Sequence, residues 1–222
     1  MSKLAAAALT MTALTLPAAA DPLLEMMRTH SKDGAIYAYE MSYTDTDLTA
    51  TGRIDPSQPE GQRIEIYTPE RDTWSDEFEA GLAEMESETD GDIWCVDFAE
   101  NVPDGADLKT ETATSATYAF TPEPDAGADG TEKKLMKKIK GEVILAKADG
   151  AILGFSMTLP KPFKPAIVAK INVFNMSVGC ARAPDGRTYV EDFSMTVSGS
   201  AMMQSFEESV SRKITALLDP VG

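Results

Sequence analysis

The chain has 222 residues, a formal net charge of −16 and 43% hydrophobic residues. So strong a negative charge repels nucleic acid and anionic membranes at long range, and we expect no nucleic-acid partner. A chain of this size buries roughly 70% of its unfolded surface. Because no segment reads as a linker, we expect one domain over residues 21–222.

The N-terminal stretch is typical of a secretory signal peptide. Lys3 precedes an apolar run from Leu4 to Leu16, and Ala18 and Ala20 occupy the A-x-A positions. We therefore expect residues 1–20 to be cleaved after Ala20. No later segment approaches the roughly 20 apolar residues of a membrane-spanning helix, so we expect no transmembrane segment. The sequence predicts a periplasmic protein, with full secretion as the second choice.

The two remaining features of composition are the cysteines and the uneven charge. Cys95 and Cys180 predict a disulfide in an oxidising compartment, worth roughly 4–5 kcal/mol in the chain-entropy model; the alternative is two buried thiols. Residues 21–132 are strongly acidic, whereas residues 133–222 carry a net positive charge. The acids are read as a solubilising surface.

The first part of the mature chain predicts a short helix and two strands. The helix begins at Asp21-Pro22 and ends near residues 31–34. From Ile36 the apolar residues alternate with polar ones, the two-residue period of a half-buried strand. The members of that strand's buried face are Tyr37, Tyr39, Met41 and Tyr43. A second strand is predicted over residues 63–67, with Ile64 and Ile66 on its buried face.

Residues 72–88 give the clearest helical pattern. Trp74, Phe78, Leu82 and Met85 lie on one stripe, and acidic residues cover the rest as a solvated face. Residues 93–98 are apolar on both faces, which predicts an interior strand.

Strands and turns dominate the second half. A strand is expected over 116–120, and two hairpins follow, over 143–159 around Asp149-Gly150 and over 171–197 around Pro184-Asp185-Gly186. In the second hairpin the apolar positions change from odd to even numbers, which predicts a bulge near Val173 and a curved sheet. Val210, Ile214 and Leu217 are spaced like a helix over 206–218.

No catalytic or metal-binding constellation is found in the sequence. His30 is the sole histidine, and no G-x-S-x-G element accompanies it. The acidic loop over 125–132 lacks the calcium-ligand series of an EF-hand, with Met136 where the last glutamate would stand. Two distant cysteines make neither a redox motif nor a zinc site. We expect no enzyme activity, no metal and no cofactor.

The segments YAFTPEPD, EKKLMKKIKGEVILAKADGAILGFSMTLPKPFKP and AKINVFNMSVGCARAPDGRTYVEDFSMTVSGSAM carry a resemblance. Over residues 115–208 the chain resembles exported proteins of the periplasmic lipoprotein-carrier superfamily, the LolA/LolB-like fold. The resemblance implies an α+β fold, a strongly curved antiparallel β-sheet or incomplete barrel with helices packed in its concave face. It also implies an apolar cavity for acyl chains, with the helix over 72–88 as a lid. No functional residue of the carriers matches a position here.

Two functions follow as hypotheses. The first is a periplasmic binding or carrier protein for a lipid, acyl or other apolar ligand, and the second is a non-catalytic interaction protein of the cell envelope with a self-filled core. A monomer is expected, with a lipid or acylated ligand or an envelope protein as its partner. The candidate ligand-cavity residues are Tyr37, Tyr39, Met41, Ile64, Ile66, Trp74, Phe78, Leu82, Met85, Phe155, Met157, Phe193 and Met195.

The lysine-rich run from Glu132 to Lys140 has two readings. It fits a short solvated helix that turns Leu135, Met136 and Ile139 inward and leads into the strand at Gly141. The alternative is contact with lipid headgroups or a membrane surface. The candidate contact residues are Lys133, Lys134, Lys137 and Lys138.

Overall fold

The computed structural model describes residues 21–124, 127–166 and 169–221. The predicted signal peptide, residues 1–20, lies outside the described residues. The helices are α1 (Pro22–Arg28), α2 (Asp76–Glu88) and α3 (Gly130–Met136), with 3₁₀ turns η1 (Arg71–Thr73) and η2 (Cys95–Asn101). The strands are β1 (Ile36–Asp45), β2 (Thr49–Ile54), β3 (Ile64–Thr68), β4 (Asp107–Glu111), β5 (Ser115–Phe120), β6 (Lys140–Ala146), β7 (Ile152–Thr158), β8 (Phe163–Ala166), β9 (Ala169–Arg182), β10 (Thr188–Ala201) and β11 (Gln204–Val221).

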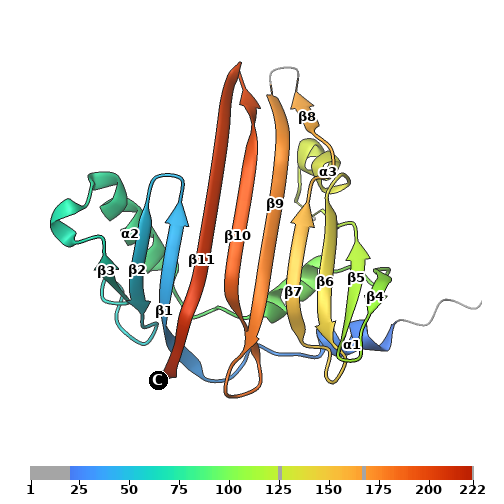
Figure 1. Ribbon diagram of the computed structural model, residues 1–222, viewed down its shortest axis with the longest axis horizontal. Helices are drawn as coiled ribbons and strands as arrows, with labels where there is room; N and C mark the ends of the chain where they lie inside the picture. The colour runs from blue at the N-terminus through green and yellow to red at the C-terminus, as the bar shows by residue number, and fades with distance from the viewer. Residues whose placement is uncertain (1–20, 125–126, 167–168, 222) are drawn as a thin grey trace, which may run out of the picture.

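All these strands join one antiparallel sheet of 11 strands. Its order is β3-β2-β1-β11-β10-β9-β7-β6-β5-β4, with β8 paired to the end of β9. The sheet is curved and open, and few helices accompany it, so the predicted α+β class with an incomplete barrel is confirmed. The three long central strands β9, β10 and β11 extend beyond their neighbours (Figure 1). The last strand of the chain lies beside the first, which joins the two halves of the sheet.

Both predicted hairpins are confirmed. β6 and β7 flank the turn at Gly150, whose positive φ of 75° suits glycine, and β9 and β10 flank the turn at Gly186. The predicted bulge near Val173 is confirmed as well, because the β9–β10 pairing shifts between Ile171 and Val173. The lysine-rich run forms α3 and leads into β6, with Ile139 buried.

The predicted C-terminal helix is wrong, because residues 206–218 belong to β11. This strand pairs with β10 on one side and with β1 on the other. Its pairing with β1 shifts register between Ala216 and Ile214, and again between Pro220 and Leu217. Each bulge moves the inward positions by one residue. Spacings of four and three residues between Val210, Ile214 and Leu217 therefore arise in a bulged strand and imitate a helix.

The predicted strand over residues 93–98 is also wrong. Trp94 makes an isolated bridge to Tyr189, and the chain then turns into η2. A short run that is apolar on both faces does not distinguish a buried strand from a buried helical turn. Here the turn is fixed by the predicted disulfide, which is confirmed: Cys95 in η2 is bonded to Cys180 in β9, with the Cα atoms 6.4 Å apart.

Side chains of α1 and η2 fill one half of the sheet's inner face. Leu24 and Met27 of α1 pack with Cys95, Ala99 and buried residues of β5, β6, β7 and β9. Phe98 stacks on Phe155 with ring centroids 4.9 Å apart. The face covered by α1, η2 and α2 is called the concave face below. Its second core cluster, around Tyr37, Trp94, Tyr189 and Ile214, lies where β1 begins and β11 ends.

Candidate functional site

Helix α2 lies over the part of the concave face that α1 and η2 do not cover. It begins at Asp76, because the hydroxyl of Ser75 accepts a hydrogen bond from the backbone N–H of Phe78 at 3.2 Å and caps the helix. The predicted start at Asp72 is thus four residues early, since residues 71–73 form η1 and Trp74 is extended. Figure 1 shows α2 beside β1, β2 and β3.

An apolar cavity of about 410 Å³ separates α2 from these strands. We call it the α2 cavity. Phe78, Leu82 and Met85 line it from the helix, and the strands contribute Met41, Ile54, Ile64 and Ile66 among others. The helical stripe predicted from the spacing of residues 78, 82 and 85 therefore faces the sheet across open space rather than in contact with it.

Two glycines line this space. Gly81 lies on the cavity side of α2, and a Cβ added there would meet no atom within 4 Å. Gly52 lies between Met41 and Ile66 in the sheet, where a Cβ would meet the backbone oxygen of Glu65 at 2.5 Å. Gly81 thus leaves open space beside the helix, whereas Gly52 permits the close approach of the β3 backbone.

Both ends of α2 are tied to the sheet by hydrogen bonds. The Glu86 carboxylate, only 7% exposed, accepts from the backbone N–H groups of Gly61 at 2.7 Å and Ile64 at 2.8 Å. Arg63 donates to the carbonyl oxygen of Thr89 at 2.7 Å, just past the helix. At the other end, the Trp74 indole donates to the carbonyl of Pro69 at 3.0 Å and its ring packs edge-on against Phe78. The middle of the helix spans the cavity.

A second cavity, of about 400 Å³, continues along β1, β11 and β10. We call it the central cavity, and the two together the concave groove. Met41 lines both, so the two spaces are neighbours along β1. The central cavity is lined by Tyr39, Phe193, Met195, Val210, Ile214 and Arg212, with Asp92, Asp97, Glu191 and residues 93, 94, 98 and 190. Burial raises the pKa of Tyr39 to about 12, and the charge of Arg212 opposes that rise only in part.

Asp45 marks the polar end of the α2 cavity. It accepts hydrogen bonds from the backbone N–H groups of Asp47 and Leu48 and from the Tyr43 hydroxyl. These bonds, that of Asp47 foremost, hold the pKa of Asp45 below its usual value despite partial burial. The carboxylate is therefore occupied with the local turn and the neighbouring tyrosine.

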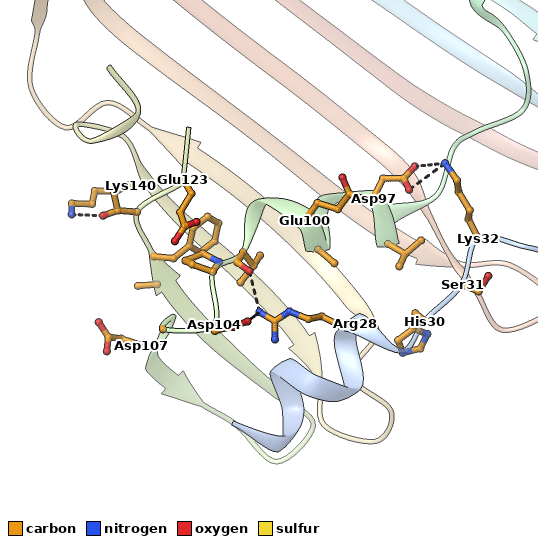
Figure 2. Close-up of a pocket in the computed structure, with 18 of the residues that line it drawn as sticks. Arg28, His30, Ser31, Lys32, Asp97, Glu100, Asp104, Asp107, Glu123 and Lys140 are labelled. Carbon is orange, nitrogen blue, oxygen red and sulfur yellow. Dashed lines mark hydrogen bonds and ion pairs between the residues drawn. The ribbon is translucent and has the colours of Figure 1, made fainter. Parts of the chain in front are cut away.

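An open polar pocket of about 1100 Å³ lies between α1, η2 and the β5–β6 edge. Figure 2 shows its charged side chains engaged with one another: Arg28 reaches Asp104 at 3.0 Å, and Lys32 lies 3.4 Å from Asp97. Lys32 also pairs with Asp92. His30 hydrogen-bonds the carbonyl oxygen of Asp149 at 2.8 Å rather than facing a nucleophile.

Asp92 and Asp97 both pair with Lys32, and their pKa values are shifted in opposite directions. Burial, and then the neighbouring Asp92 carboxylate, raise the pKa of Asp97. Burial acts in the same direction on Asp92, but hydrogen bonds led by that from Lys32 outweigh it and lower the pKa of Asp92. Within residues 21–124, 127–166 and 169–221 no cluster of three or more His, Cys, Asp or Glu side chains is arranged to hold a metal ion. Arg28 and Lys32 on the wall of this pocket are thus both paired with acidic side chains.

The structure distributes the predicted ligand-cavity residues over three environments. Met41, Ile64, Ile66, Phe78, Leu82 and Met85 line the α2 cavity, and Tyr39, Met41, Phe193 and Met195 line the central cavity. Tyr37 packs against Trp94, Trp74 packs outside on Phe78, and Phe155 and Met157 belong to the filled core. Lys133, Lys134, Lys137 and Lys138 are exposed on α3 and the turn after it.

Sequence reasoning missed Arg212 and the contribution of β2. Arg212 keeps the alternation of Val210 and Ile214, which would have placed it on the inner face had residues 206–218 been read as a strand. Strand β2 supplies Ala50, Gly52 and Ile54 to the α2 cavity. Its sequence, TATGRI, has few large apolar residues and gave no strand pattern.

Comparison of the chain with protein-family models, with curated proteins and with solved structures finds no match. The part of the chain that the structure describes contains no helix long and apolar enough to cross a membrane. The class defined by fold and groove is an open, curved antiparallel sheet with a helix-covered apolar cavity.

Proposed function

We propose that the protein binds or carries a lipid, acyl or other apolar ligand in the concave groove. The observation that carries this proposal is the apolar α2 cavity of about 410 Å³ between Leu82 and the strands beneath it. This volume lies within the roughly 300–1,000 Å³ typical of small-molecule sites.

The lining of the α2 cavity is apolar surface that a bound apolar chain would remove from water. Interiors pack as densely as organic crystals, and cavity lining forgoes dispersion contacts that a filled site would make. Transfer of apolar ligand surface from water into such a space contributes about 25 cal/mol per Å². An apolar chain would therefore gain from the cavity, and the protein would gain stability from the chain.

The covering helix suits this role. Its contacts over the cavity come from Phe78, Leu82 and Met85, while its hydrogen-bonded anchors lie at the two ends. Methionine is unbranched and polarisable, so Met41 and Met85 are suited to adjust to chains of different shape. Helix α2 would act as a lid. Its middle would move away from the sheet to admit a ligand, while the hydrogen bonds at its ends would persist.

The cellular setting belongs to the same proposal. A signal peptide over residues 1–20 and an oxidised Cys95–Cys180 pair are in keeping with an exported, periplasmic protein. The resemblance to the LolA/LolB-like fold supports an acyl-binding, non-enzymatic role. A second candidate is an interaction protein of the envelope, favoured by the filling of half the concave face by α1 and η2.

Substitution of Gly81 tests the proposal directly. Gly81→Leu places a side chain in open space beside the cavity and improves helix propensity by roughly 0.8 kcal/mol, so the fold is expected to persist. Ala83→Leu, two residues on at an exposed position, is the matched control. Native mass spectrometry with lipid extraction, on protein purified from a periplasm, should find a bound acyl species in the wild type and control and little in Gly81→Leu.

Two results would count against the proposal. One is a wild-type protein that carries no lipid and takes up no fluorescent fatty acid. The other is equal uptake by Gly81→Leu and the wild type. Either result would favour the interaction protein and direct the search to protein partners.

A further inference from the structure

Arg212 occupies an unusual position on the concave face. It faces Tyr43 in β1 and Phe193 in β10 in the strand register, and the same row continues through Val178 to Phe155. Its neighbours along β11 on this face are Val210 and Ile214. A guanidinium thus stands within a row and a column of apolar and aromatic side chains.

The charge of Arg212 has no ionic partner within residues 21–124, 127–166 and 169–221. Its guanidinium carbon lies 5.9 Å from the ring centroids of both Tyr43 and Phe193, a stacking environment that leaves its N–H donors free. By contrast, the next residue, Lys213, points to the opposite face and pairs with Asp192 at 3.1 Å.

The acids that line the same space do not neutralise Arg212. Asp92 and Asp97 are bound by Lys32. Asp90 accepts a hydrogen bond from the backbone N–H of Asp92. Glu191 lines the central cavity, and Glu84 and Asp90 line a neighbouring hollow that Arg212 also borders; none of the three forms an ion pair with Arg212. Among the residues that the structure describes, Arg212 is therefore the cation that lines the concave groove without an ion pair, in a chain whose net charge is −16.

Arg212 also lies at the right place relative to the apolar space. It lines the central cavity, and its register partner Tyr43 lines the α2 cavity. We propose that Arg212 binds the carboxylate headgroup of a long-chain amphiphile whose apolar tail lies in the α2 cavity. This inference rests on the proposed function and narrows its ligand class to fatty-acid-like molecules. A guanidinium fork matches a planar carboxylate in two parallel hydrogen bonds, and the rings of Tyr43 and Phe193 lie beside it.

A matched pair of probes separates headgroup from tail. Dansylundecanoic acid and its methyl ester differ only in the charge of the headgroup, and dansyl fluorescence reports entry into an apolar site. The wild type is expected to bind the acid about tenfold more tightly than the ester, as one or two charge-assisted hydrogen bonds would give. Arg212→Gln should reduce the affinity for the acid to that for the ester and leave the ester unchanged. Lys213→Gln, the neighbour on the opposite face, should alter neither.

The failures of the two proposals are distinguishable. Binding of neither probe by the wild type would overturn the proposed function itself. Binding of both probes with no preference for the acid, or an equal loss of both in Arg212→Gln, would overturn the role of Arg212 and leave the apolar cavity intact. Circular dichroism of Arg212→Gln checks that the sheet is unchanged, since the side chain is exposed on one side.

Discussion

The guanidinium of Arg187 lies over the indole of Trp94, 3.5 Å from its centroid. The Arg187 side chain is only 12% exposed, pairs with Asp185 and donates to the carbonyl oxygens of Lys32 and Ala35. It thus joins the β9–β10 turn to the segment that leads from α1 into β1. The contact lies at the end of the sheet where β1 begins and β11 ends.

Arg187→Lys should destabilise the fold. Lysine cannot reproduce a planar fork that serves two carbonyls and a carboxylate while it stacks on a ring. We expect a loss of about 2–3 kcal/mol in the free energy of unfolding, measured by urea denaturation. The control is Arg182→Lys in the same hairpin, whose side chain is 42% exposed and pairs with Asp149; a loss below about 1 kcal/mol is expected. Equal losses in both variants would contradict this account.

Acid should weaken the same region. The hydrogen bond from Arg187, followed by the Arg187 backbone N–H and charge, holds the pKa of Asp185 below its usual value. Because the folded pKa is the lower one, the stabilisation is present above the unfolded value of roughly 3.9 and is lost as the pH falls through the folded value. Asp185→Asn should flatten part of the decline in stability below about pH 4. Asp45, Asp55 and Asp149 are shifted in the same direction, so part of the decline remains.

That pH dependence is read from unfolding curves at a series of pH values for the wild type and Asp185→Asn. Two parallel curves, with the same slope below pH 4, would show that Asp185 carries no part of the acid sensitivity.

The disulfide should contribute substantially to stability. It joins η2 to the middle of the sheet across a sequence separation of 85 residues, and the Cys95 side chain is fully buried. In the chain-entropy model a loop of this length is worth roughly 4–5 kcal/mol. Cys95→Ser with Cys180→Ser should lower the urea midpoint accordingly, and reductant should shift the wild type in the same direction while leaving the variant unchanged. An unaltered midpoint in the variant would refute the estimate.

Much of the fold could be predicted because turns and alternation are local. Gly150 and Gly186 fix two hairpins, and the change of phase near Val173 revealed a real bulge. The errors came from non-local effects. Bulges in β11 are set by its pairing with β1, and they gave residues 206–218 a helical spacing that only the partner strand explains. The η2 turn likewise depends on Cys180, far away in sequence.

The site was predictable in part for the same reason. The helical stripe of Phe78, Leu82 and Met85 follows from local spacing, and it does line the cavity. The open volume does not follow from it, since small residues of separate elements, Gly81 in α2 and Ala50 and Gly52 in β2, line it together. Local spacing also does not predict that Arg212 forms no ion pair among the described residues. That depends on which side chains the neighbouring strands place beside it, and these strands are far apart in sequence.

Glu86 should control how firmly α2 covers the groove. Its two carboxylate oxygens each accept from a backbone N–H, that of Gly61 and that of Ile64, and both donors lose their partner if the carboxylate is removed. A hydrogen bond to a charged group contributes about 1.5–3 kcal/mol. Glu86→Ala should therefore release the C-terminal end of α2, and Glu86→Gln, which keeps one acceptor oxygen, should have an intermediate effect.

Hydrogen exchange of the α2 amides measures this release, because local opening exposes them without global unfolding. We expect exchange to accelerate at least tenfold in Glu86→Ala, as a loss of about 1.4 kcal/mol or more implies, while amides of β9 and β10 stay protected. Glu84→Ala is the control. Glu84 is exposed and lies two residues before Glu86 on the same helix, so its replacement should leave exchange of the α2 amides unchanged. If α2 is a lid, faster opening should also raise both the uptake and the release rates of a dansyl fatty acid. Accelerated exchange with unchanged ligand rates would mean that ligands enter the groove by a route other than beneath α2.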